Sequence, residues 1–324
     1  MTDTRVAELV EAARAGRVRA IARLISLIEN NAPELPELLR LLAPHTGRAY
    51  VVGLTGSPGV GKSTTTTALV AAYREQGLKV GVLAVDPSSP FSGGAVLGDR
   101  VRMQKHSLDQ GVYIRSMASR GHLGGLSTAA PQALRVFDLA GFDVVLVETV
   151  GVGQSEVEIA GTADTTLVLL APGMGDGIQA AKAGILEIGD VFVVNKADRD
   201  GAQNLIRELR TMIAMADRTP EDWKPPIVRT VASSGEGIDE LVEKIAAHRG
   251  HGEETGRLAE RRLARSRAEI EQLALASVRA SFLAGGRRGL DELAAQVRDG
   301  SLDPYAAADR LLAEVGADRV EVTG

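Results

Sequence analysis

The chain has 324 residues, a formal net charge of −5 and an apolar fraction of 44%. This length and composition predict a globular protein that forms one α/β core with appendages or two small domains. The acidic balance disfavours nucleic acid as a partner, because phosphate backbones bind basic surfaces, and the lack of cysteine excludes disulfides and thiolate metal sites.

Residues 1–47 are predicted to form a helical N-terminal extension. Apolar residues recur there at helical spacing in three runs, which contain Val6, Ile21 and Leu38. The first run lacks the basic start and the unbroken apolar stretch of a signal peptide. The sequence also lacks the roughly 18 consecutive apolar residues of a membrane span. We therefore expect a cytoplasmic protein with no membrane partner.

Residues 48–250 are predicted to form an α/β domain, because short apolar runs alternate there with helical segments. Most of the runs are apolar throughout, as expected for strands that are buried on both faces of a parallel sheet. This alternation predicts a doubly wound, mostly parallel sheet, with ligands at the carboxyl ends of its strands. The six expected strands are Tyr50–Leu54, Val80–Val85, Val144–Val147, Thr166–Leu170, Val191–Val194 and Ile227–Val231.

Residues 251–324 are predicted to form a helical C-terminal arm, because strand signals stop near Gly250. The stretch HGEETG, residues 251–256, is expected to be a linker. Later in the arm, Asp303-Pro304 predicts a helix N-cap followed by proline at the first helical position. From the residues alone, the helices of the arm either pack on a core of their own or bury their apolar side on a second subunit.

Residues 56–64, GSPGVGKST, follow the first expected strand and match the pattern of a phosphate-binding P-loop. Glycines permit the tight turn and let backbone N–H groups approach phosphates, while a helix that begins near Lys62 directs its positive dipole end at the same charge. Lys62 is expected to contact the β- and γ-phosphates, and the Ser63 hydroxyl to bind Mg²⁺. The predicted nucleotide contacts of this loop are Gly56, Ser57, Pro58, Gly59, Val60, Gly61, Lys62, Ser63 and Thr64.

The motif Asn195-Lys196-Ala197-Asp198 follows the expected strand 191–194 and suits guanine. The Asp198 carboxylate can accept hydrogen bonds from guanine N1–H and the exocyclic amine, a pair of donors that adenine does not present. Asn195 can bond the purine edge, and the Lys196 stem can lie on the ring face. The alternative is a polar turn in which Asp198 caps a helix. With the P-loop upstream, we expect this motif to select GTP and GDP.

Small residues after the last expected strand are a further candidate for contact with the base. Their backbone amides can donate to guanine O6, although a simple helix-entry turn explains the same composition. The three residues are Val231, Ala232 and Ser233.

Three acidic residues are candidate partners of Mg²⁺. Glu148 ends the strand 144–147, where nucleotide triphosphatases place such an acid, and its extra length favours a contact through water. Asp86 follows the strand 80–85, although it can equally cap that strand. Asp99, in the Gly/Ser/Pro-rich loop that follows, is the better candidate for an outer metal contact.

Gly151 and Gln154, which follow Glu148 in the chain, are candidates for catalysis. The Gly151 N–H can donate to the γ-phosphate and thereby sense its presence. Gln154 can orient an attacking water, although a solvated loop glutamine fits equally well. With Lys62 and Glu148, these residues form the predicted catalytic set.

The ordered motifs resemble the MeaB/ArgK family of G proteins, to which the human methylmalonic aciduria type A protein also belongs. The resemblance implies a P-loop GTPase domain with helical extensions, in which the C-terminal arm builds a homodimer. This chain departs from the family pattern at Arg100-Val101, where Lys-Thr is usual, which leaves contacts of that loop undecided. The resemblance rests on GSPGVGKST (56–64), VDPSSPFSGGAVLGDRVRM (85–103), GFDVVLVETVGVGQSE (141–156) and NKAD (195–198).

The resemblance also implies a function. Proteins of this family hydrolyse GTP slowly, bind adenosylcobalamin-dependent methylmalonyl-CoA mutase, gate loading of its cofactor and protect or rescue the enzyme. In this chain the segment PGMGDGIQAAK, residues 172–182, resembles the family's mobile switch, with Asp176 and Lys182 as candidate signalling residues.

Two other functions compete with this one. A metabolic kinase of the arginine-transport type is disfavoured because the NKAD motif selects GTP and no separate substrate cluster follows it. A metallochaperone GTPase is disfavoured because the sequence has no cysteine and its five histidines are scattered.

Overall fold

The structure is a computed structural model that describes residues 2–87, 108–119, 129–149, 155–173, 185–215, 219, 221–284 and 287–322. Backbone contacts divide the chain into two compact units, residues 1–263 and residues 264–324. Within the described ranges, no helix has both the length and the apolar content to cross a bilayer.

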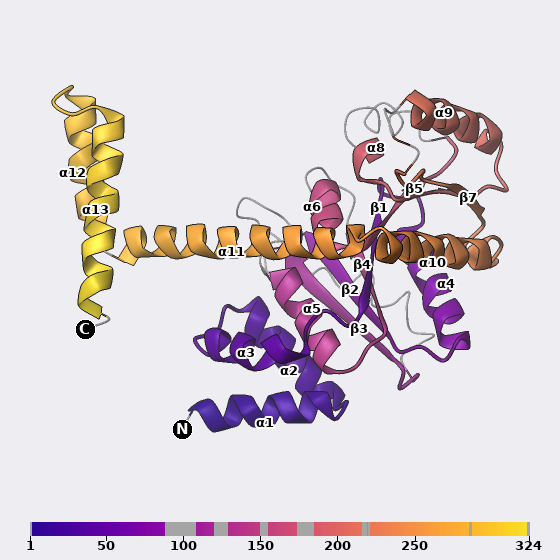
Figure 1. Cartoon of the computed structure of the whole chain (residues 1–324), viewed down its shortest axis with the longest axis horizontal. Coiled ribbons are helices and arrows are strands. Elements are labelled where there is room, and N and C mark those ends of the chain that lie inside the picture. The colour runs from indigo at the N-terminus through magenta and orange to yellow at the C-terminus, as the bar shows by residue number, and fades with distance from the viewer. Residues whose placement is uncertain are drawn as a thin grey trace. The chain divides into compact units, whose positions relative to one another are not determined.

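A seven-stranded sheet forms the centre of the first unit (Figure 1). Its strands are β1 (Tyr50–Thr55), β2 (Val80–Pro87), β3 (Val112–Ser119), β4 (Val144–Thr149), β5 (Thr165–Leu170), β6 (Val191–Asn195) and β7 (Ile227–Thr230). The strands lie in the order β3-β2-β4-β1-β5-β6-β7, and the neighbours pair in parallel. Strands β1, β4, β5 and β6 are buried along their whole length, as their unbroken apolar runs predict. The predicted doubly wound fold is confirmed.

Strand β3 was missed by the sequence analysis. It lies at the edge of the sheet, where Tyr113 and Met117 are buried while the residues between them are partly exposed. In the middle of the strand, Arg115 forms an ion pair with Glu29, 86 residues earlier in the chain. An edge strand that carries a paired arginine lacks the unbroken apolar run that marked the other strands.

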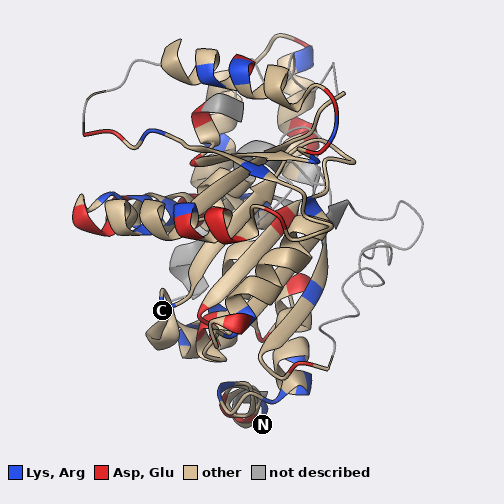
Figure 2. Cartoon of the chain, turned by 90° about the vertical axis from the view of Figure 1, so that its right-hand side faces the viewer, with Lys and Arg blue, Asp and Glu red and all other residues tan. Residues whose placement is uncertain are grey.

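Helices cover both faces of the sheet. On one face, α4 (Lys62–Glu75) and α10 (Ile238–Glu254) share a hydrophobic core with β1 and its neighbours. On the other face lie α5 (Ala129–Leu139), α6 (Ser155–Thr162) and α9 (Ala202–Met215), and the short α8 (Ile185–Ile188) precedes β6. Acidic and basic residues are interspersed along the helices seen in Figure 2, in keeping with the modest net charge.

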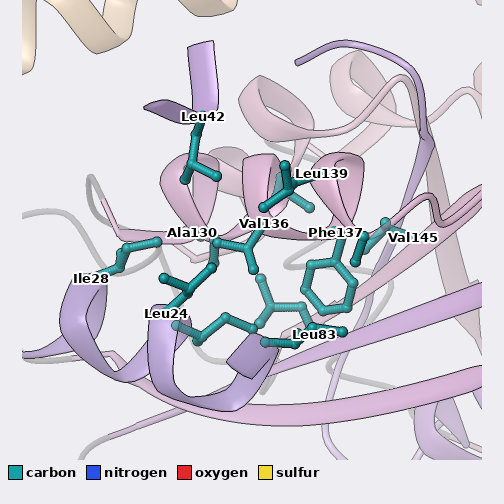
Figure 3. Packing of buried hydrophobic residues seen from close by; sticks show 14 of the residues in the cluster. Leu24, Ile28, Leu42, Leu83, Ala130, Val136, Phe137, Leu139 and Val145 are labelled. Atoms are coloured by element: carbon teal, nitrogen blue, oxygen red, sulfur yellow. The ribbon is translucent and has the colours of Figure 1, made fainter. Parts of the chain in front are cut away.

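The N-terminal helices pack against α5 and complete the core on its face of the sheet. They are α1 (Thr2–Arg14), α2 (Val18–Glu29) and α3 (Leu35–Leu42), followed by the 3₁₀ turn η1 (Ala43–His45). Leu24, Leu42 and Phe137 point into one shared cluster (Figure 3), and each is almost fully buried. Burial of each such side chain contributes about 1.5–3 kcal/mol. The predicted helical extension therefore packs as part of the first compact unit.

The expected linker at residues 251–256 is largely helical. Helix α10 continues to Glu254, and the chain turns at Gly256, which has a φ of 77°. Although this stretch is polar, it packs against other residues: Gly252 is buried against Leu258, and His251 lies beside Trp223. The prediction of a linker is wrong for residues 251–254, which belong to α10 and pack on Trp223 and Leu258.

The remaining helices are α11 (Arg257–Ala284), α12 (Arg287–Arg298) and α13 (Pro304–Val322). The second unit contains most of α11 and the whole of α12 and α13. Asp303 Oδ1 accepts hydrogen bonds from the backbone N–H groups of Tyr305 and Ala306, at 2.9 and 3.1 Å. This confirms the predicted N-cap ahead of Pro304.

Candidate functional site

The P-loop connects the carboxyl end of β1 to α4. Its glycines at positions 56, 59 and 61 have φ values of 137°, 82° and 99°. A Cβ on Gly56 would lie 2.3 Å from the carbonyl oxygen of Leu169, and a Cβ on Gly61 would lie 2.3 Å from Asn195 Nδ2. Conformation and close packing therefore both require glycine at positions 56 and 61. Within the loop Val60 is buried, Ser57 is half-buried, and Pro58 and Gly59 are exposed.

Lys62 and Ser63 are the first two residues of α4, and the next residue, Thr64, is exposed. The Lys62 side chain is buried, and its Nζ donates to the carbonyl oxygens of Gly56, at 2.6 Å, and Ser57, at 3.2 Å. These hydrogen bonds hold the ammonium group against the P-loop.

The structure brings Ser63 and Glu148 together. Glu148 lies near the carboxyl end of β4, beside β1, and its carboxylate is buried. Its Oε1 accepts a hydrogen bond from Ser63 Oγ at 2.6 Å, and its Oε2 accepts one from Thr66 Oγ1 at 2.9 Å. Hydroxyl and carboxylate oxygens are the donors that Mg²⁺ prefers, so this pair fits the metal that the P-loop motif implies.

Asn195 joins the P-loop to the loop after β7. It is the last residue of β6, and its Nδ2 donates to the carbonyl oxygen of Val60 at 2.8 Å. Its Oδ1 accepts from Thr230 Oγ1 and from the backbone N–H of Ala232, both at 3.1 Å. The sequence analysis placed this carboxamide on the purine edge, whereas the structure shows it bonded to three protein groups.

The rest of the NKAD motif lies next to the P-loop. Lys196 adopts a left-handed conformation, with a φ of 57°, and its Nζ donates to the carbonyl oxygen of Gly59 at 2.6 Å. Ala197 is half-buried, and Asp198 is exposed. The phosphate motif and the expected base motif thus both lie at the carboxyl ends of the strands.

Two of the three amides expected to face guanine O6 are bonded within the protein. The Val231 N–H donates to the carbonyl oxygen of Glu236 at 3.0 Å, and the Ala232 N–H donates to Asn195. Ser233, at the next position, is exposed.

Six predicted site residues lie wholly or partly outside the described part of the structure. The backbone of Asp86 belongs to β2, but its side chain lies outside the described part of the structure. The others that lie outside the described residues are Asp99, Gly151, Gln154, Asp176 and Lys182.

Comparison with known proteins shows to which family this chain belongs. The model of the family described as "Methylmalonyl Co-A mutase-associated GTPase MeaB" matches residues 21–287. The chain belongs to the MeaB family.

Relatives of this MeaB-family protein span nearly its whole length. A Pyrococcus abyssi protein whose name places it among the GTPases is 49% identical over 95% of this chain and 96% of the relative. The GTPase ArgK of Escherichia coli is 37% identical over 76% of each chain. The mouse mitochondrial methylmalonic aciduria type A homolog is 34% identical over 92% of this chain and 76% of the relative. The crystal structure of an LAO/AO transport system kinase matches with a TM-score of 0.72 and 28% identity, over 97% and 98% of the two chains.

In this MeaB-family protein the sequence analysis missed Thr66 and Thr230, whose hydroxyls bond Glu148 and Asn195. Helical spacing offers a signal for Thr66, because it lies three residues after Ser63 and therefore on the same face of α4. Thr230 offers no such signal, because its contact with Asn195 depends on the pairing of β6 with β7.

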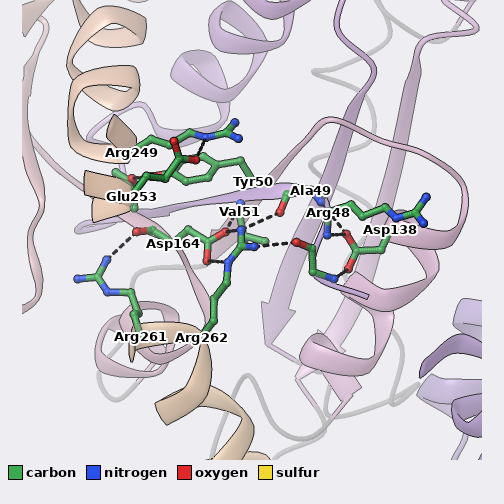
Figure 4. A network of polar contacts seen from close by, with 12 residues as sticks. Arg48, Ala49, Tyr50, Val51, Asp138, Asp164, Arg249, Glu253, Arg261 and Arg262 are labelled. Carbon is green, nitrogen blue, oxygen red and sulfur yellow. Dashed lines mark hydrogen bonds and ion pairs between the residues drawn. The ribbon is translucent and has the colours of Figure 1, made fainter. Parts of the chain in front are cut away.

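A polar network lies at the other end of the strands, where they begin (Figure 4). Asp164 and Asp190 directly precede β5 and β6. Arg262 binds both carboxylate oxygens of Asp164, at 3.0 and 2.7 Å, and Arg261 binds both oxygens of Asp190, at 2.7 and 2.9 Å. Arg262 also donates to the carbonyl oxygen of Gly47 at 2.7 Å. These bonds anchor the first turns of α11 to the sheet.

His248 extends this network into a cavity of about 90 Å³, which is lined in part by Trp223 and Arg257. Its Nε2 lies 3.3 Å from Asp190 Oδ1, and its Nδ1 lies 2.7 Å from Thr165 Oγ1. The fold thus gives His248 an acidic neighbour, Asp190, from a distant part of the chain.

The network displaces the pKa values of Asp190 and Tyr50, and it raises those of Arg261 and Arg262. Burial alone would raise the pKa of Asp190, but hydrogen bonds from His248 and Arg261 lower it to about 2. Burial raises the pKa of Tyr50 to about 12, against the opposing effect of its hydrogen bond with Thr165.

Proposed function

We propose that this protein binds GTP and GDP with Mg²⁺ and hydrolyses GTP. The observation that carries the proposal is the position of Asn195, whose side chain contacts Val60 in the P-loop and Ala232 in the loop after β7. Motifs that suit phosphate and guanine therefore surround one place at the carboxyl edge of the sheet. Membership of a family of GTPases supports the same activity.

In this proposal each described residue has a task. Lys62 contacts the β- and γ-phosphates, and the helix that it begins presents backbone N–H groups to them. Ser63 binds Mg²⁺ directly, and Glu148 binds it through water. When bound, Mg²⁺ neutralises the charge that develops on the β- and γ-phosphate oxygens. Asp198 accepts from guanine N1–H and the exocyclic amine.

Other residues complete the proposed site. Ser233 has the best placed of the three amides for guanine O6, because Val231 and Ala232 already donate within the protein. Asp86 and Asp99 are proposed as outer partners of Mg²⁺. Gly151 is proposed to sense the γ-phosphate, and Gln154 to orient the attacking water.

We further propose that the protein is a chaperone of adenosylcobalamin-dependent methylmalonyl-CoA mutase in the cytoplasm. It would gate cofactor loading and protect or reactivate the mutase, with Asp176 and Lys182 signalling the nucleotide state. The family description, which names association with methylmalonyl-CoA mutase, supports this role, as does the name of the mouse relative.

We also propose a division of labour along the chain. Residues 1–47 form the helical extension, residues 48–250 the GTPase domain, and residues 251–324 an arm that makes a homodimer. Exposed apolar residues in the arm support its role as an interface, and they include Ile270, Leu275, Leu290 and Leu312.

A GTP turnover assay tests the chaperone role. Turnover should rise when purified methylmalonyl-CoA mutase is added to the wild-type protein and should stay at background for the Lys62→Ala variant. A pull-down of the mutase that is identical with GTP, with GDP and without nucleotide would contradict nucleotide-dependent association.

A small-molecule kinase is the second candidate, because the fold matches that of an LAO/AO transport system kinase. Such an enzyme would transfer the γ-phosphoryl group to an amino acid rather than to water. Mass spectrometry after incubation with GTP and arginine or ornithine separates the two functions, since phosphorylated amino acid would support the kinase.

A further inference from the structure

We propose that Thr66 is a positioning residue that holds the Glu148 carboxylate in place for Mg²⁺. The inference rests on the proposed binding of Mg²⁺ and guanine nucleotide at this site. It adds a residue that lies outside the P-loop motif, residues 56–64, and outside strand β4, which carries Glu148.

Two hydroxyl groups from one helix fix the two oxygens of Glu148. Ser63 Oγ donates to Oε1 at 2.6 Å, and Thr66 Oγ1 lies 2.9 Å from Oε2. Both residues lie on α4, three positions apart, so they share the face that packs on β4. Thr66 is fully buried and Glu148 is 5% exposed. With both of its oxygens bonded, the carboxylate cannot turn about its last side-chain bond without the loss of a hydrogen bond.

A glutamate at this position needs such a restraint more than an aspartate would. Its longer side chain has one more rotatable bond, so the strand determines the position of its carboxylate less tightly. A buried carboxylate is also costly unless its oxygens accept hydrogen bonds. When the Ser63 oxygen binds the metal, Thr66 still holds the other oxygen of Glu148 in place.

The neighbouring threonines provide a matched comparison within the same helix. Thr65 Oγ1 donates to the Gly61 carbonyl oxygen at 3.0 Å, and Thr67 Oγ1 donates to the Ser63 carbonyl oxygen at 2.8 Å. Thr66 Oγ1 lies 3.0 Å from the Lys62 carbonyl oxygen and 2.9 Å from Glu148 Oε2, so its one hydroxyl proton is shared between these two acceptors. Thr67→Val therefore removes one backbone contact, whereas Thr66→Val removes that contact and the one to the carboxylate.

The test measures the affinity of fluorescent GDP over a series of Mg²⁺ concentrations. For Thr66→Val, the Mg²⁺ concentration at half-maximal effect should rise about tenfold, which is the size expected for one hydrogen bond to a charged group. Affinity in the presence of a chelator should change by less than about twofold, because Thr66 acts through the metal site. Thr66→Ser should restore the wild-type Mg²⁺ dependence, and Thr67→Val should retain it.

Three results would overturn the inference. They are an unchanged Mg²⁺ dependence in Thr66→Val, a failure of Thr66→Ser to restore it, and an equal loss of affinity with and without Mg²⁺, which marks a purely structural role. If Thr66→Val gives no cooperative thermal transition, Thr66→Ala takes its place. A wild-type protein that binds no guanine nucleotide would instead contradict the proposed function.

Discussion

Asn195 is a buried side chain whose hydrogen bonds hold two loops of the proposed nucleotide site. Asp198, three residues later, is exposed. The two residues belong to one motif but meet different demands: Asn195 organises the protein, and Asp198 is left to recognise the base. Substitution of Asn195 should therefore mainly lower the stability of the protein, whereas substitution of Asp198 should mainly lower its affinity for GTP.

Asn195→Ala should destabilise the protein even without nucleotide. It removes the partner of the Val60 carbonyl oxygen and of the Ala232 N–H, and buried groups left unpaired cost about 1–3 kcal/mol each. The free energy of unfolding in urea should fall by about 2–3 kcal/mol. The control, Asp198→Ala, changes an exposed residue and should stay within about 0.5 kcal/mol of wild type. Equal stability of the two variants would contradict the structural role of Asn195.

Asp198→Asn should weaken GTP and reduce discrimination against ATP. The substitution keeps the size of the side chain but removes the charge that strengthens its hydrogen bonds with guanine. Competition binding with GTP and ATP measures the change, and calorimetry of Lys62→Ala provides a control in which triphosphate affinity should be lost. If the preference for GTP survives in Asp198→Asn, the assignment of the base motif is wrong.

At the scale of elements, the carboxyl ends and the amino ends of the strands have separate roles. The carboxyl ends of β1, β4 and β6 present the P-loop, Glu148 and Asn195, whereas the amino ends of β5 and β6 anchor α11 through Asp164 and Asp190. Strand β6 takes part in both, because Asp190 precedes it and Asn195 ends it. The Asp190 carboxylate, which is bonded by His248 and Arg261, is the group whose contribution to stability can be measured by pH.

The stabilisation from Asp190 should depend on pH with a defined sign. Its pKa is lowered from 3.8 to about 2 in the folded protein, so folding favours its ionised form. The contribution is fully present above about pH 4 and is lost as the pH falls toward 2. It amounts to about 2 kcal/mol. The difference in the free energy of unfolding in urea between wild type and Asp190→Asn should therefore be constant above about pH 4 and should shrink as the pH falls toward 2. A difference that does not change with pH would contradict the assignment.

At the scale of the whole molecule, the chain combines a compact sheet domain with a helical unit, residues 264–324. In the second unit, Ile270 is 68% exposed and Leu273 is 38% exposed, and their spacing of three residues places them on one side of α11. Large apolar side chains gathered on one helix are typical of a surface that another protein covers. A second copy of this chain is the proposed partner.

The proposed homodimer should depend on these residues. Wild-type protein should have twice the mass of one chain in analytical ultracentrifugation, because association buries the apolar side of α11. Ile270→Asp combined with Leu273→Asp should shift the protein toward the monomer, since the two residues share one side of α11 and buried unpaired charge opposes association. Val18→Asp alters an apolar residue of α2 that is 58% exposed and should leave the mass unchanged. A dimer that survives the double substitution would place the interface elsewhere.

The amino-acid sequence by itself determined the sheet class, the P-loop and the NKAD motif. These features depend on residues close together in the chain: glycines with special dihedral angles between Gly56 and Gly61, and apolar runs whose period specifies a strand. Local geometry of this kind is encoded locally, so spacing and residue type suffice to predict it.

Tertiary structure alone decided which of these pieces meet. Asn195 bonds Val60 across 135 residues, Thr66 bonds Glu148 across 82, and Arg262 bonds Asp164 across 98. Strand β3 likewise forms through its parallel pairing with β2, which precedes it in the chain by a long connection. Contacts between such distant residues arise from the order of strands and the packing of helices on them, and no local pattern in the chain records either.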